Sequence, residues 1–124
     1  TGNIFVSSYS PEDRIYVYDE AGIYKKEIIF PNFRLITFKI DSTGNIFYSG
    51  SDNTERGTYK LTPDGTKTKL NSIESSSIEI DSAGNLYLGV SYYRGDQFTS
   101  KFDPNGNLLF AFDGSIKECP HTNQ

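Results

Sequence analysis

Few residues of this chain could carry out covalent chemistry, and they lie together near its C-terminal end. His121 is the only histidine and Cys119 the only cysteine among the 124 residues. A cysteine nucleophile needs a histidine base that converges on it and a third group that orients this base. Two residues this close in the sequence, on either side of Pro120, are more typical of a loosely held tail. Zinc needs three or four protein ligands, so the sequence predicts no catalytic residue, no metal site and no cofactor.

Three segments with the composition of loops combine acidic residues with arginine, and two of them also contain tyrosine. They are residues 8–14, 51–56 and 91–97. Because tyrosine and arginine are enriched at protein interfaces, partner binding is a hypothesis for Tyr9, Arg14, Arg56, Tyr92, Tyr93 and Arg94. The alternative is a solvated rim with weak salt bridges. Residues 94–96 also spell an integrin-type Arg-Gly-Asp tripeptide, which is short enough to occur by chance.

A recurring Asp-x-x-Gly pattern predicts tight turns. Residues 103–107 resemble the start of a calcium-binding loop, but they lack the downstream glutamate and the flanking helices of an EF-hand. An aspartate in such a turn can instead accept N–H groups of the turn itself, while the glycine adopts a positive φ. The sequence therefore assigns a structural role in turns to Asp41, Gly44, Asp81, Gly84, Asp103 and Gly106.

The segments that these turns connect have the pattern of β-strands. Residues 36–40 and 76–80, for example, alternate apolar and polar side chains over a short length and are rich in isoleucine. No window shows a convincing helical period of 3.6 residues. We therefore expect an all-β fold.

Two landmarks recur along the chain with the same period. Gly2, Gly44 and Gly84 each precede Asn and a hydrophobic–aromatic pair, and they are 42 and 40 residues apart. The glycines of a second turn, at positions 22, 65 and 106, are 43 and 41 residues apart. Four short antiparallel strands in about 40 residues are typical of one β-propeller blade. The repeats cover approximately residues 1–35, 36–75 and 76–124.

This pattern resembles the NHL-type and related six-bladed propellers, in which an Asp-x-x-Gly-Asn-hydrophobic-aromatic segment recurs once per blade, as in residues 41–47 and 81–87. The resemblance implies three four-stranded antiparallel sheets with strands A to D from the inside outward. The first repeat begins within its A–B turn, so its inner strand is missing, and the tail at residues 115–121 is a candidate to supply it. We expect half of a six-bladed propeller or an open array.

Composition and charge limit the possible partners. A net charge of −4 and a sequence pI of about 4.9 argue against nucleic-acid binding. No apolar run approaches the ~20 residues that span a bilayer. One cysteine does not identify the redox compartment, and an extracellular or cell-surface location is slightly favoured over the cytoplasm.

The expected function is that of a non-catalytic module for self-assembly and for binding a protein or small ligand. The A–B and C–D turns are short, whereas the B–C and D–A loops are longer and differ between repeats, and variable loops on a rigid scaffold often carry binding sites. A homo-oligomer, or the remainder of a longer propeller, would cover the flanks of the array. The alternative is a fragment of a metal-dependent hydrolase or lyase, similar to the lactonases among six-bladed propellers, with most ligands outside this chain. Glu79 is then an isolated candidate.

Overall fold

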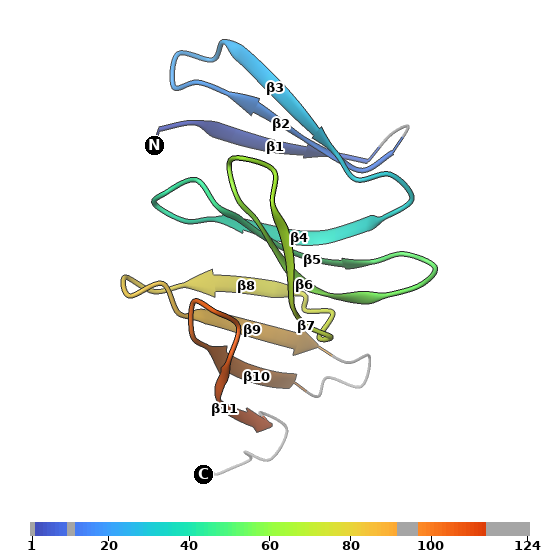
Figure 1. Ribbon diagram of the computed structural model, residues 1–124, viewed down its shortest axis with the longest axis vertical. Helices are drawn as coiled ribbons and strands as arrows, with labels where there is room; N and C mark the ends of the chain where they lie inside the picture. Colours follow the sequence, from blue (N-terminus) through green and yellow to red (C-terminus); the bar gives the residue numbers. More distant parts are fainter. Residues whose placement is uncertain (1, 10–11, 92–96, 114–124) are drawn as a thin grey trace.

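The computed structural model describes residues 2–9, 12–91 and 97–113 as β-strands joined by turns and loops, with no helix (Figure 1). Without a helix, this part of the chain has no helical segment that could cross a membrane. The strands are β1 (Ile4–Ser8), β2 (Arg14–Tyr18), β3 (Tyr24–Ile29), β4 (Arg34–Ile40), β5 (Ile46–Ser51), β6 (Arg56–Leu61), β7 (Lys67–Asn71), β8 (Ser77–Ile80), β9 (Leu86–Ser91), β10 (Gln97–Phe102) and β11 (Leu108–Asp113).

The strands form three antiparallel sheets that are stacked one on another (Figure 1). The first sheet has three strands in the order β1-β2-β3. The second has the order β4-β5-β6-β7, and the third contains β8 to β11 in the same arrangement. Each sheet thus joins strands that follow one another in the sequence, as in a propeller blade. The all-β fold and its propeller-type sheets are confirmed.

The structure places the start of the second sheet earlier than the sequence pattern does. We predicted a strand from Ile36, but β4 begins at Arg34. The pairing of β4 with β5 is irregular between Leu35 and Thr37, so Ile36 stands outside the regular alternation. Because this irregularity interrupts the period of two, the alternating pattern does not include the first residues of the strand.

The turns are stabilised by aspartate side chains that accept N–H groups of their own turn. Asp41 Oδ1 accepts the N–H groups of Thr43 and Asn45, each at 2.9 Å, and its Oδ2 accepts the Asn45 side-chain amide. The same bonds recur around Asp81 and Asp103. The glycines of these three turns, Gly44, Gly84 and Gly106, have φ of 92°, 88° and 89°. The carboxylates therefore direct both oxygens at donors of the turn.

These bonds predict a specific response to acid. The N–H of Asn85 lowers the pKa of Asp81, and the side-chain amide of Asn107 lowers that of Asp103. The stability they contribute is present above the unfolded-state pKa, about 3.9, and is lost as the pH falls through the lower folded-state values. We expect the free energy of unfolding, measured with urea, to decline below about pH 4. The Asp81→Asn/Asp103→Asn double variant should show a shallower decline, and an unchanged slope would contradict this assignment.

Two apolar cores lie between the sheets. The first joins Ile15 and Phe30 of the first repeat to Ile46, Tyr48 and Tyr59 of the second sheet. Burial raises the pKa of Tyr59 to about 12, so this phenol stays neutral at physiological pH. The second core joins the second and third sheets and contains Phe47, Ile78, Leu86, Leu88 and Phe102.

Each junction also contains hydrogen bonds between a side chain and the main chain. At the first junction, Asp13 Oδ2 accepts the N–H of Leu35 at 2.6 Å. At the second, the N–H of Ser75 donates to Ser49 Oγ at 2.7 Å, and Thr58 Oγ1 donates to the Ile73 carbonyl at 2.8 Å. The two junctions therefore use different polar groups in addition to their apolar cores.

Candidate functional site

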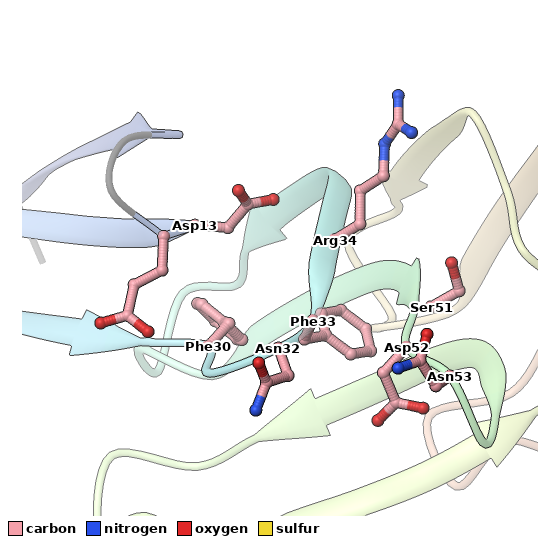
Figure 2. Close-up of a pocket in the computed structure, with 9 residues that line it drawn as sticks. Asp13, Phe30, Asn32, Phe33, Arg34, Ser51, Asp52 and Asn53 are labelled. Atoms are coloured by element: carbon pink, nitrogen blue, oxygen red, sulfur yellow. The ribbon is translucent and has the colours of Figure 1, made fainter.

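A polar pocket of about 560 Å³ opens where the first and second sheets meet (Figure 2). It lies on the side of the sheets that carries the β1–β2, β3–β4 and β5–β6 loops, which we call the loop face. All three loops contribute to its lining, and its polar residues are Glu12, Asp13, Asn32, Arg34, Ser51, Asp52 and Asn53. It combines carboxylates with amides and one arginine.

The β3–β4 loop is held in place by the packing of two aromatic rings. The N–H of Phe33 donates to the carbonyl of Phe30, and both side chains enter the core beside Tyr48. Between them, Asn32 adopts a φ of 58°, a left-handed conformation that asparagine tolerates better than most residues. The loop therefore turns the polar side chain of Asn32 toward the pocket while the rings anchor its ends (Figure 2).

The carboxylates of the pocket already accept hydrogen bonds within the protein. Asp52 Oδ1 accepts the N–H groups of Thr54 and Glu55, each at 2.8 Å, and these bonds lower its pKa. Asp13 binds a main-chain N–H of β4, and Glu12 lies 3.4 Å from the Arg14 guanidinium. The pocket can accept further hydrogen bonds and attract cationic groups.

The structure disperses the residues predicted to bind a partner. Tyr9 lies beside Asp13 and Arg34 on the loop face. The Arg14 guanidinium donates to Glu27 at 2.7 Å, whereas Arg56 is exposed, with its guanidinium 3.9 Å from Glu74. The described candidates therefore form no common site. Tyr92, Tyr93 and Arg94 lie outside the described residues, as do Cys119, His121 and the tail at 115–121.

Glu79, the isolated candidate of the hydrolase alternative, forms an ion pair. Its carboxylate lies 3.6 Å from Lys39 Nζ of the neighbouring inner strand. Within residues 2–9, 12–91 and 97–113, no three His, Cys, Asp or Glu side chains form a group that could hold a metal ion.

A second candidate site is the face of the first sheet that is turned away from the second sheet, which we call the outer face. Directly opposed residues of antiparallel strands share a face, and Ile4 pairs with Tyr18 and Val6 with Tyr16. The Tyr18 ring meets the Tyr24 ring edge-to-face at 6.0 Å. The apolar and aromatic residues of the outer face are Ile4, Val6, Tyr16, Tyr18, Tyr24 and Ile29.

Comparison of the repeats shows how unusual this exposure is. Ile4 is 46% exposed, whereas its equivalents Ile46 and Leu86 are 4% and 0% exposed because a preceding sheet covers them. Val6 is 45% exposed, and its equivalent Tyr48 only 2%. The outer face thus has the composition of a surface that is buried in the other two repeats.

The third sheet presents a different face at the opposite end of the stack. Tyr87, Lys101 and Phe110 are paired side by side on the surface turned away from the second sheet, which we call the far face. The Lys101 ammonium lies 5.3 Å from the Tyr87 ring centre. In the second sheet the equivalent pair, Lys60 over Phe47, faces the third sheet, which buries the Phe47 ring.

Sequence reasoning identified the loops of the pocket but missed the contacts that shape it. The hydrogen bond from Leu35 to Asp13 joins residues far apart in the sequence, and no local motif signals it. The Pro31–Asn32 pair between two phenylalanines was an available signal for the turn of the β3–β4 loop.

These features define a stack of propeller-type blades in which no further sheet of the described residues covers the outer face or the far face. No family model and no curated protein matches the sequence, so the NHL-type resemblance remains a prediction. Sixteen chains of solved structures match the fold. One of them is the dipeptidyl peptidase 4 of Porphyromonas gingivalis, with a TM-score of 0.68 and 20% identity over 93% of this chain. The chain spans 17% of the length of that protein, and a likeness at this identity shows the fold alone.

Proposed function

We propose that the chain is a non-catalytic β-propeller module that assembles with further blades through its outer face and binds a partner through its loop face. The observation that carries the proposal is the exposure of Ile4 and Val6, whose equivalents are buried in both other repeats. Exposed apolar faces of this kind favour association. The NHL-type, six-bladed architecture is the arrangement that we expect to result.

The far face of a second copy of the chain is the proposed partner of the outer face. The buried junction between the second and third sheets packs Phe47, beside Lys60, against the apolar face of the next sheet. Tyr87 and Lys101 would contribute the equivalent pair at a junction between two copies. Two copies joined in this way at both ends would supply six sheets, and in a longer polypeptide a further blade would take the same place.

The loop face is the proposed surface for a protein or small-ligand partner. Its pocket presents three carboxylates, two amides and an arginine, which suits a polar ligand that carries a positive charge. The exposed tyrosine Tyr9 lies beside the same loops. Burial of its ring against a partner would add apolar contact area next to the polar pocket.

Analytical ultracentrifugation over a range of concentrations tests the assembly. We expect the wild-type chain to associate and Ile4→Asp to weaken association by at least about tenfold, since a charge would be buried in the junction. Ile23→Asp is the matched control because Ile23 is exposed in the β2–β3 turn and its equivalent, Thr66, is exposed as well. A wild-type chain that stays monomeric at all concentrations, or equal dissociation constants for wild type and Ile4→Asp, would show that the outer face is not a docking surface.

A further inference from the structure

A groove of about 620 Å³ lies between the first and second sheets, on the side opposite the loop face. The first sheet lines it with Phe5, Val17 and Ile28, and the second with Ile46 and Leu61. Residues of the β4–β5 and β6–β7 turns also line it. The groove has the size and the apolar walls of a small-molecule site.

At the equivalent position of the next junction, the turn of the third sheet contacts the second sheet. A Cβ atom built on Gly106 would lie 3.1 Å from the Leu70 side chain, so the turn of the third sheet packs directly on the second sheet. At Gly65, the equivalent glycine of the second sheet, a Cβ atom would meet nothing within 4 Å. The packing of this turn on the preceding sheet therefore differs between the two junctions.

Two lysines line the rim of the groove beside one glutamate, Glu27, whose carboxylate is paired with Arg14. Lys26 pairs with Val17 across the sheet, which places its side chain on the groove side, and Lys25 also lines the groove. Within the part of the chain that the structure describes, neither ammonium forms an ion pair with a carboxylate. The neighbouring Glu27 forms an ion pair with Arg14 at 2.7 Å. An anionic group at this rim would meet two positive charges in a chain whose net charge is −4.

We propose that this groove binds a small carboxylate with a hydrocarbon body, of the class of medium-chain fatty acids. The hydrocarbon body would lie against Phe5, Ile28 and Leu61, and the carboxylate would lie at Lys25 and Lys26. Apolar walls favour the displacement of water by the chain, and the charged rim fixes the direction in which the ligand enters. This site does not depend on the proposed assembly, because the groove and the outer face lie on opposite sides of the first sheet.

Titration of the full chain with octanoate, followed by NMR at the backbone amides of the groove, tests the proposal. Octan-1-ol has the same hydrocarbon chain without the charge. We expect octanoate to bind at least about fivefold more tightly than octan-1-ol. The double variant Lys25→Gln/Lys26→Gln should weaken the binding of octanoate by about tenfold and remove the preference for octanoate over octan-1-ol. Lys69→Gln, which changes an outer-strand lysine of the second sheet, should bind octanoate like the wild type.

A second variant tests the apolar part of the groove without changing its charge. Ile28→Trp places a larger ring between the sheets and should abolish binding of both ligands, with circular dichroism confirming that the sheet fold is retained. The proposal is overturned if octanoate and octan-1-ol bind equally, if the lysine pair has no effect, or if the shifted amides lie outside the groove. Absence of octanoate binding at millimolar concentration overturns it as well. Loss of association in Ile4→Asp with unchanged octanoate binding would separate the two proposals.

Discussion

Replacement of Gly50 by alanine is expected to destabilise the protein by at least about 3 kcal/mol, a large share of the stability of a domain of this size. Gly50 lies in β5 and pairs with Leu35 of β4. A Cβ atom at this position would overlap the main-chain oxygen of Arg34 and lie 2.5 Å from the ring of Phe33. The backbone oxygen cannot move without disrupting the pairing of β4 and β5. Urea unfolding of both proteins measures the effect.

Gly89→Ala is the matched control for this substitution. Gly89 also lies within a central strand, but a Cβ atom there would meet the hydroxyl of Ser77, which can rotate away. Because alanine is otherwise better than glycine in a strand, we expect a change within about 1 kcal/mol. Equal losses of stability in the two variants would contradict the close packing of the Phe33 ring against Gly50 of β5.

Tyr48→Ala is expected to cost about 3–5 kcal/mol, the usual cost of removing a large ring from a core. The Tyr48 ring stacks on Tyr59 at 5.3 Å and meets Phe30 and Phe33 edge-to-face at 4.9 and 5.6 Å. These rings come from both the first and the second repeats, so a cavity there would weaken the junction and not only one sheet. Thermal unfolding followed by circular dichroism should show a clearly lower Tm.

Tyr59→Phe provides the contrast within the same cluster. The Tyr59 hydroxyl is buried and makes no hydrogen bond of normal distance and angle within the described residues, although the nearby Glu55 helps to raise its pKa. Removing a buried polar group without a partner relieves its desolvation cost while the ring is kept. We therefore expect Tyr59→Phe to be neutral or more stable by up to about 1 kcal/mol. A loss comparable with that of Tyr48→Ala would indicate that the hydroxyl has an essential partner.

The strands and their grouping into sheets could be predicted because both are local properties. The alternation of side chains and the Asp-x-x-Gly turns each involve only a few neighbouring residues. Because both recur with one period, they predicted three successive sheets. The candidate sites depend instead on what lies opposite each strand. Residues 1–5 and 43–47 have the same sequence, Thr-Gly-Asn-Ile-Phe, yet Ile4 is exposed and Ile46 is buried. No local pattern can make that distinction.

The groove was beyond sequence reasoning for a related reason. The turn glycines 65 and 106 occur in matching motifs, but the preceding sheet lies within 4 Å of a Cβ atom only at Gly106, through Leu70. The irregular pairing of β7 places Leu70 between two paired residues, Lys69 and Asn71. Such a shift changes the side chain that reaches the neighbouring turn without changing the type of residue at the turn itself.

The different hydrogen bonds at the two junctions mean that the repeats are not interchangeable. At the first junction the main chain of β4 donates to Asp13, and the position that matches Asp13 in the second repeat is Arg56, which has no acceptor atom in its side chain. At the second junction the hydroxyl of Thr58 donates to a main-chain carbonyl, and the residue that matches Thr58 in the first repeat is Ile15. A chain with its repeats in another order would leave hydrogen-bond donors and acceptors without partners at its new junctions. The linear order of the repeats is thus encoded in their polar contacts, although their apolar cores alone would tolerate other permutations.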